Sequence, residues 1–240
     1  MTKIKLPLII SLLIASSIGF SIEVQAQFSL SQNTVKNGNK QGTKPNIGAP
    51  TGRRRAGAGR NPDCPSSLTK LTALVPGDAE KSKLAPTVAA YPTYWFYVPE
   101  LPETARTAEL VLQVKDGKKV ENVYRKPFTL SGKPGIISIN PPQKPQYSLK
   151  ENKTYHWYFH IYCGDIEETS DNFYVDGFVK KKTQTQTVDS DWDIFTNLAK
   201  QRRAKPQDAT INQNWVNLLN KFGLSDLAKQ PIIEHYNLEK

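Results

Sequence analysis

Apolar and polar residues alternate with a period of two along the middle of the chain, from Leu68 to Lys182. This alternation is typical of β-strands that bury one face, and turn-forming residues interrupt it at short intervals. Pro127 lies inside one strand candidate, which places that strand at a sheet edge or breaks it there. The Asp116-Gly117 pair predicts a tight hairpin between two others. The predicted strands are 71–75, 93–98, 108–114, 120–130, 135–139, 155–163 and 172–180.

The apolar spacing changes to a helical period after Lys182. Asp189 or Ser190 can cap a first helix and Asp208 a second, and Gly223 is a natural C-terminal stop. We therefore predict a mainly β chain: an antiparallel immunoglobulin-like sandwich over 64–182, followed by a helical segment over 183–240. A helical hairpin, with a short third turn from Ser225, is expected to pack on the sandwich. The apolar helix positions are Trp192, Phe195, Leu198, Ala199, Ile211, Trp215, Leu218, Leu219 and Phe222.

Residues 1–26 have the pattern of a secretory signal peptide. Lys3 and Lys5 precede an apolar run, and Val24-Gln25-Ala26 fits a small-x-small cleavage site. The run is shorter than the roughly 20 residues that a membrane-spanning helix needs. We expect cleavage near Ala26 and a periplasmic or extracellular protein, which is not an integral membrane protein and does not meet nucleic acid.

Residues 27–63 are rich in Gly, Pro, Asn, Lys and Arg and have one aromatic residue. Such a segment buries too little apolar surface to order itself, so a disordered basic arm is predicted. The chain has a net charge of +10, and this arm carries much of it. Either it contacts an anionic envelope polymer or lipid surface, or it is a solvated spacer. The residues for polyanion contact are Arg53, Arg54, Arg55 and Arg60.

The chain contains two cysteines, Cys64 and Cys163. Export into an oxidising compartment favours a disulfide between them. Two buried thiols, or Cys163 as a nucleophile, are the alternatives.

The segment YHWYFHIYC, residues 155–163, concentrates aromatic, histidine and cysteine side chains. In a strand, His156 and His160 share a face but lie about 13 Å apart, and Cys163 points the other way. A single metal ion cannot bind all three. We expect Tyr155 to face inward as a structural residue, because its spacing from the preceding leucine is similar to a tyrosine corner.

The opposite face of this strand is the candidate ligand-binding surface. Rows of aromatic and histidine side chains suit carbohydrate or peptide ligands. The alternative is that the C-terminal helices cover this face. Its residues are His156, Tyr158, His160 and Tyr162.

Other chemical signals are weaker. Residues 164–171 collect carboxylates but lack the spacing of an EF-hand calcium loop. The chain has no G-x-S-x-G nucleophile motif, no glycine loop for phosphate and no paired cysteines for zinc. No catalytic residue, metal site or cofactor is predicted.

Several motifs in order resemble a known family. They are CPSSLTKLTALVP at 64–76, TYWFYVPE at 93–100, AELVLQ at 108–113, VYRKPFTLSGKPGIISI at 123–139, the YHWYF segment with Cys163, and FGL at 222–224. The chain resembles, over roughly 63–233, the exported, largely cyanobacterial family catalogued as domain of unknown function 928. The resemblance implies export and a shared fold, and it implies no activity, cofactor or active site.

The expected function is that of an exported cell-envelope protein with a binding or structural role and no catalytic activity. One alternative is a hydrolase of envelope polysaccharide or peptidoglycan that uses His160 with Asp165 or Glu167. Another is an interaction module that docks onto another exported protein through its C-terminal helices.

Overall fold

A computed structural model describes residues 49–57, 64–78, 80–116, 119–164, 166, 172–183 and 190–239. Contacts divide the chain into units 1–45 and 46–240, and every described residue belongs to the second unit. The predicted signal peptide and most of the predicted arm lie outside the described residues. Within the described ranges, no helix is long and apolar enough to cross a membrane.

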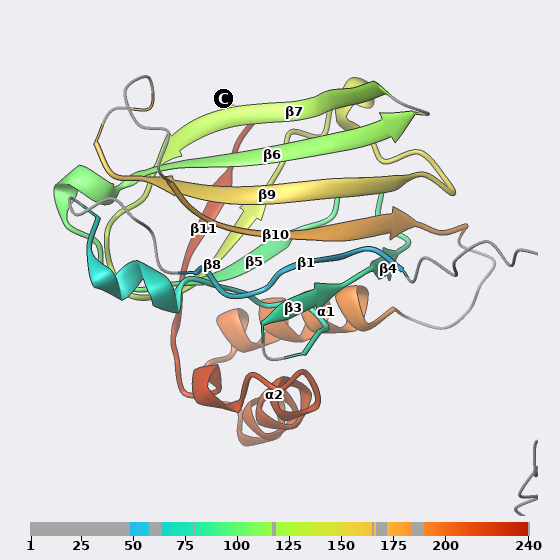
Figure 1. The fold of residues 1–240 in the computed structure, drawn as a ribbon. Coiled ribbons are helices and arrows are strands. Elements are labelled where there is room, and N and C mark those ends of the chain that lie inside the picture. Colours follow the sequence, from blue (N-terminus) through green and yellow to red (C-terminus); the bar gives the residue numbers. More distant parts are fainter. Residues whose placement is uncertain are drawn as a thin grey trace, which may run out of the picture. The chain divides into compact units, whose positions relative to one another are not determined.

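Two sheets build the protein (Figure 1), and a two-stranded ribbon joins them. The five-stranded sheet has the order β4 (Ala85–Thr87), β10 (Asn172–Lys181), β9 (Thr154–Tyr162), β6 (Thr107–Asp116), β7 (Lys119–Thr129). The four-stranded sheet has the order β11 (Ile232–Asn237), β8 (Gly135–Asn140), β5 (Tyr94–Val98), β2 (Thr72–Ala73). The ribbon pairs β1 (Thr51–Arg53) with β3 (Lys81–Lys83).

The main core lies between the two sheets, where alternate side chains of β9 meet those of β5. The ring of Phe96 stacks on Phe159 with centroids 4.2 Å apart and meets Trp157 edge-on at 5.8 Å. All three side chains are buried. The inward assignment of the apolar face of β9 is therefore confirmed.

The chain is mainly β with two helices after the sandwich strands, as predicted. Each predicted strand forms, and β7, which contains Pro127, lies at a sheet edge. The predicted strands pair in an antiparallel manner, whereas two strands that were not predicted pair in parallel, β4 with β10 and β11 with β8. Both are edge strands that reach their partners through long connections instead of hairpins. The finer immunoglobulin-like topology stays a prediction.

The helices are α1 (Asp191–Ala204) and α2 (Ala209–Lys221). Ser190 and Asp208 cap them by accepting backbone N–H bonds from residues three positions on. Gly223 follows α2 with a φ of 66°, the left-handed value that favours glycine. Both helical predictions are confirmed, as is a short 3-10 turn at Ser225–Leu227. The segment 183–240 is not only helical, however, because it ends in β11.

The helices pack on the outer surface of the four-stranded sheet. There, Trp95 of β5 and Ile136 of β8 join Phe195 of α1 and Trp215 of α2 in a second apolar cluster. The ring of Phe195 lies 6.1 Å from that of Trp95 and 5.1 Å from that of Trp215. The helices thus cover the outer surface of the four-stranded sheet, and Trp192 of α1 also reaches the main core.

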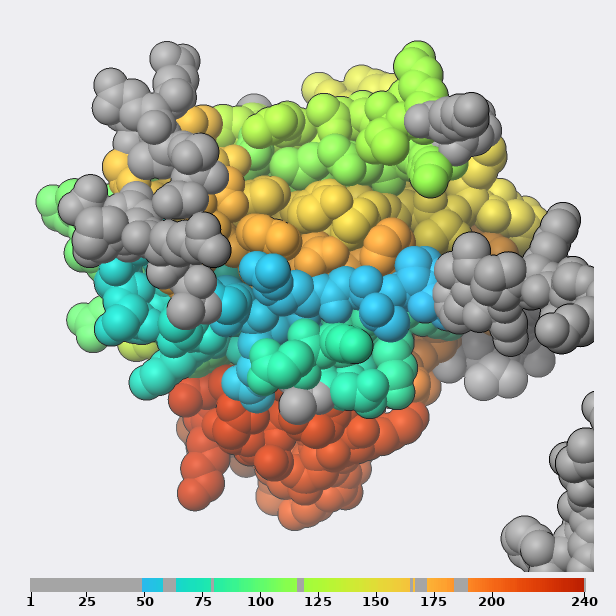
Figure 2. Space-filling model, in the orientation of Figure 1, coloured from blue at the N-terminus to red at the C-terminus, as the bar shows by residue number. Residues whose placement is uncertain are grey.

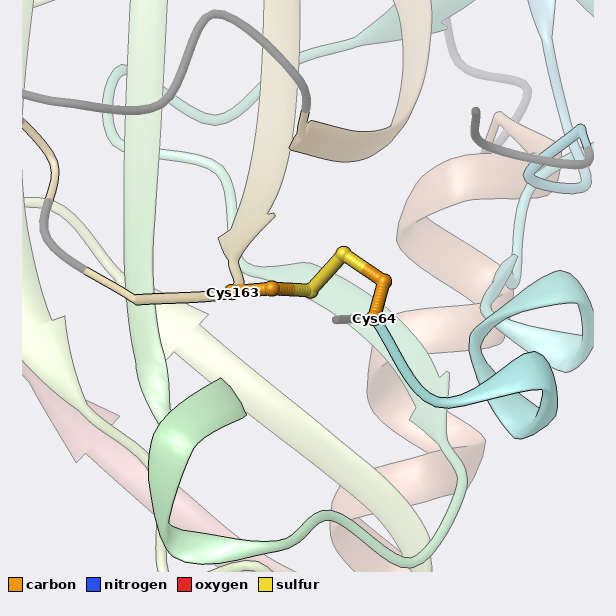
Figure 3. The surroundings of a disulfide bond; sticks show 2 residues. All are labelled: Cys64 and Cys163. Atoms are coloured by element: carbon orange, nitrogen blue, oxygen red, sulfur yellow. A yellow bond between two sulfur atoms is a disulfide. The ribbon is translucent and has the colours of Figure 1, made fainter. Parts of the chain in front are cut away.

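Cys64 and Cys163 form a disulfide with Cα atoms 5.3 Å apart, across 99 positions of sequence (Figure 3). The predicted bond is confirmed. It ties the start of the 3-10 turn Ser66–Lys70 to the end of β9. Because β9 is the middle strand of the five-stranded sheet, the bond anchors an N-terminal segment to the centre of the fold.

The tyrosine corner also forms. The Tyr155 hydroxyl accepts the backbone N–H of Lys150 at 2.8 Å, and Leu149 just before it is buried. Tyr155 is itself buried, in agreement with a structural role.

The prediction that the disordered arm extends to residue 63 is wrong, because residues 51–57 belong to the fold. Arg54 is fully buried, and its guanidinium donates to the backbone carbonyls of Asp78, at 2.7 Å, and Phe222. Burial, and secondarily the neighbouring Arg55, lower the pKa of Arg54 to about 10. The β1–β3 pairing and this buried cation give the segment enough contacts to order it, which its composition alone did not indicate.

A candidate ligand-binding groove on the five-stranded sheet

The outer face of the five-stranded sheet carries the candidate site. Figure 2 shows β6, β9 and β10 as one continuous surface, with the blue residues of β1 along its lower edge. The expectation that the C-terminal helices cover this face is wrong, because they pack on the other sheet. The helices follow the apolar face that β5 and β8 present, whereas the outer face of β9 is polar and aromatic.

Rings follow one another along this face, because alternate residues of a strand point the same way. His156 stacks on Phe178 of β10 with centroids 4.0 Å apart and meets Tyr158 at 4.1 Å. Tyr158 and His160 are 5.7 Å apart, and His160 and Tyr162 are 6.0 Å apart. The structure therefore brings the four predicted surface residues together in one row. Tyr162 is buried at the end of the row, whereas the other three β9 residues are half-buried.

His156 stands at the centre of a hydrogen-bonded relay with Asp176 and Tyr158. Its Nε2 lies 2.6 Å from the Asp176 carboxylate, and its Nδ1 lies 2.8 Å from the Tyr158 hydroxyl. Asp176 is 8% exposed and also accepts the backbone N–H of Arg53 at 2.8 Å. A carboxylate only accepts, so Nε2 donates to it and Nδ1 is left to accept the tyrosine proton. The relay thus points from a buried carboxylate to a phenol on the surface.

The Tyr158 phenol keeps its proton at neutral pH. Burial raises its pKa, and the negative charge of Asp176 adds to the shift. Its hydroxyl is hydrogen-bonded to Nδ1 of His156.

A second cluster at the other end of the row is structural. The Glu109 carboxylate is 3% exposed and accepts two bonds from Arg125, at 2.7 and 3.0 Å. It also accepts the Tyr162 hydroxyl at 2.8 Å, and burial followed by this bond raises the pKa of Tyr162 to about 12. These bonds occupy Tyr162 within the sheet, so it is a packing residue and not a ligand contact.

His160 lies between the two clusters. Its Nδ1 is 3.1 Å from the side-chain oxygen of Asn172, and burial lowers its pKa. Asp165 and Glu167, which the hydrolase hypothesis paired with it, lie outside the described residues. That pairing stays a prediction.

The relay opens into a groove of about 720 Å³, a size typical of small-ligand sites. His156, Tyr158 and Phe178 form one wall. Stacked rings and a phenol hydroxyl give this wall apolar area with polar edges.

The other residues that line the groove are mostly polar and include two lysines, with Pro50 and Val120 as the apolar ones. Lys115 and Gln113 come from β6, and Asn152 and Lys153 come from the turn before β9. None of the described residues that line the groove is Asp or Glu. Because Asp176 is buried behind His156 and Lys115 is exposed, the described lining offers a positive charge and no exposed carboxylate, and an anionic ligand fits it best.

Three of the four arginines predicted to contact a polyanion are described by the structure, and their surroundings differ. The Arg53 guanidinium lies 4.6 Å from the centroid of the Tyr174 ring on the outer face. Nη2 of Arg55 donates to both carboxylate oxygens of Asp226, at 2.9 and 3.0 Å. Arg60 lies outside the described residues. Arg54 cannot contact a polyanion, because it is buried.

Sequence reasoning missed Asp176, Phe178 and Lys115. One signal was available: in NFYVDGFVK, Asp176 interrupts an apolar strand, and a buried carboxylate needs partners. Among the described residues, no group of three or more His, Cys, Asp or Glu side chains is placed to hold a metal ion.

Comparison with known proteins relates the chain to one protein family. A family with the description Domain of Unknown Function (DUF928) matches the chain over residues 55–192 and 190–232. No curated protein and no solved structure matches.

Proposed function

The chain belongs to the family described as Domain of Unknown Function (DUF928), and from this premise we propose that it is an exported protein that binds an acidic polysaccharide of the cell envelope. The groove on the outer face of the five-stranded sheet is the binding site. The observation that carries the proposal is the combination of a ring-lined wall with a lysine-bearing wall, with no acidic residue among the described groove residues.

The chemistry of both walls supports this ligand class. The faces and edges of Tyr158 and Phe178 suit the C–H surfaces of sugar rings. The amides of Gln113 and Asn152 can exchange hydrogen bonds with hydroxyl groups. A lipid surface would instead favour an exposed apolar patch rimmed by cations, and this groove mixes polar and apolar groups throughout.

Acidic groups on the polymer would account for the lysine side chains that line the groove. Lys115 and Lys153 line the groove and are exposed. Lys115 attracts carboxylates through interactions that salt screens over about 10 Å at 0.1 M. Affinity should therefore fall with ionic strength.

Export is supported by two features of the chain. The N-terminal 26 residues have the signal-peptide pattern. The Cys64–Cys163 disulfide is of a kind that persists in oxidising compartments.

Calorimetric titration of the purified full chain tests the proposal. Polygalacturonate and alginate oligomers are the acidic ligands, and an uncharged glucan oligomer is the comparison. We expect the acidic oligomers alone to bind, more weakly as salt increases. Failure of both acidic oligomers to bind at low salt would refute the proposal.

Two variants locate the site. Phe178→Ala and Lys115→Ala should each weaken binding by about tenfold, the effect of losing roughly 1.4 kcal/mol. Lys133→Ala is the matched control, since Lys133 is exposed and outside the groove lining. Equal losses in Lys115→Ala and Lys133→Ala would place binding elsewhere, and equal melting temperatures would show that all three variants are folded.

A further inference from the structure

We infer that the groove is also a catalytic site, in which Tyr158, His156 and Asp176 cleave a uronic-acid polysaccharide by β-elimination. The inference rests on the proposed function, because it requires the polymer to bind in the same groove. It specifies the reaction, the bond that breaks and the role of each of the three residues.

The relay geometry is the first support. A surface that only binds sugars needs no buried carboxylate behind a histidine, yet Asp176, His156 and Tyr158 are joined by contacts of 2.6 and 2.8 Å. The buried Asp176 holds one imidazole tautomer and stabilises the imidazolium when it forms, so His156 can accept a proton through Nδ1. Tyr158 lies at the groove, where its oxygen can meet a substrate C–H bond.

The reaction needs such a relay because its first proton is weakly acidic. The hydrogen on C5 of a uronic acid is adjacent to the carboxylate, and its removal places negative charge on that carboxylate. Preorganised cations and hydrogen-bond donors stabilise charge that develops in this way. Lys115 and the amides of Gln113 and Asn152 line the same groove as Tyr158.

Every proton and electron pair in the proposed step is accounted for. The Tyr158 oxygen takes the C5 proton while its own proton passes to His156 Nδ1, and Asp176 balances the imidazolium. The C5–H electron pair becomes the C4=C5 double bond, and the C4–O glycosidic bond breaks. The leaving oxygen takes the proton from Tyr158, which regains its proton from His156. The products are an unsaturated uronate end and a free hydroxyl, and no water is consumed.

Hydrolysis is a poorer fit to the same groove. Glycosidases commonly place two carboxyl groups on either side of the scissile bond. The described lining contains none, and the one carboxylate behind it is committed to His156. Proton abstraction by a tyrosine and histidine uses the groups that are present.

The test incubates the full chain with polygalacturonate, alginate and hyaluronate. Elimination is followed by the ultraviolet absorbance of the conjugated C4=C5 bond, and mass spectrometry identifies the fragments. We expect fragments whose masses sum to the parent oligomer, because no water is added. Calorimetry on the same samples measures binding independently of turnover.

Variants assign the roles. Tyr158→Phe and His156→Gln should each lower kcat by about a hundredfold to ten-thousandfold, the usual contribution of a general base, while Kd changes by less than about threefold. Tyr174→Phe is the matched control, since Tyr174 lies on the same face with its ring 6.2 Å from Tyr158 and outside the relay. It should keep full turnover.

The outcomes separate the two proposals. Binding of an acidic polymer without any unsaturated product would overturn the catalytic inference and leave the proposed function standing. Fragments that carry the mass of an added water, or full turnover by Tyr158→Phe, would also overturn it. The absence of binding by all three polymers would remove both proposals.

Discussion

Removal of the Cys64–Cys163 bond should destabilise the fold by about 4 to 5 kcal/mol. The bond closes a loop across 99 positions. In the chain-entropy account, a loop of this length restricts the unfolded chain by about 4.7 kcal/mol at 25 °C. Because typical domains are stable by only about 5 to 15 kcal/mol, this is a large share of the total.

The variant that tests this is the double substitution Cys64→Ser and Cys163→Ala. Alanine is chosen at position 163 because Cys163 is buried in the main core, where a serine hydroxyl would lack a partner. Urea unfolding, followed by tryptophan fluorescence and by circular dichroism, gives the free energy of unfolding and its slope. The oxidised protein, the reduced protein and the variant are compared under identical conditions.

Single substitutions complete the design. Either single change breaks the bond, so each should cost about as much as both together, and the measured effects should be strongly non-additive. Additive single effects, or a double variant that loses less than about 1 kcal/mol, would mean that the bond does not constrain the native protein.

Three further predictions follow from buried groups. Arg54→Met should lower the free energy of unfolding by about 2 kcal/mol or more, because two carbonyls lose a charged donor, whereas Arg54→Lys should lose less; urea titration measures both. Gly177→Ala should cost about 1 to 3 kcal/mol, since its Cβ would lie 2.4 Å from the Trp157 ring, and an unchanged melting temperature would contradict this. The lowered pKa of His160 means that the unfolded chain binds a proton more readily. Stability should therefore fall as pH drops through about 6.5, and less steeply in His160→Asn, as urea titrations across this range would show.

The local pattern of apolar and polar residues was sufficient to predict the long strands and the helices. The alternation in residues 155–163 placed Trp157 and Phe159 inward, and Pro127 placed its strand at an edge. The caps Ser190 and Asp208 marked the helix starts. These features depend on residues within one strand or one turn, where spacing alone determines which side chains share a face.

Short strands, and strands whose pairing partners are distant in the sequence, could not be predicted from the local pattern. The three-residue strands β1, β3 and β4 are too short to show a period, and β4 contains Pro86. The β11 segment follows two helices and becomes a strand only because the edge of β8 is there to pair with it. An amphipathic helix likewise indicates that one face is buried, but not which sheet buries it.

The sequence by itself determined that this chain is mainly β, that Cys64 has one cysteine to pair with, and that the histidines of β9 share its outer face. Only the tertiary structure decided that this face is uncovered and that Asp176 meets His156. The β9–β10 register sets Phe178 opposite His156 and Asp176 opposite Tyr158. Register depends on contacts summed along both strands, so a slip of one residue would turn Asp176 inward and remove the relay.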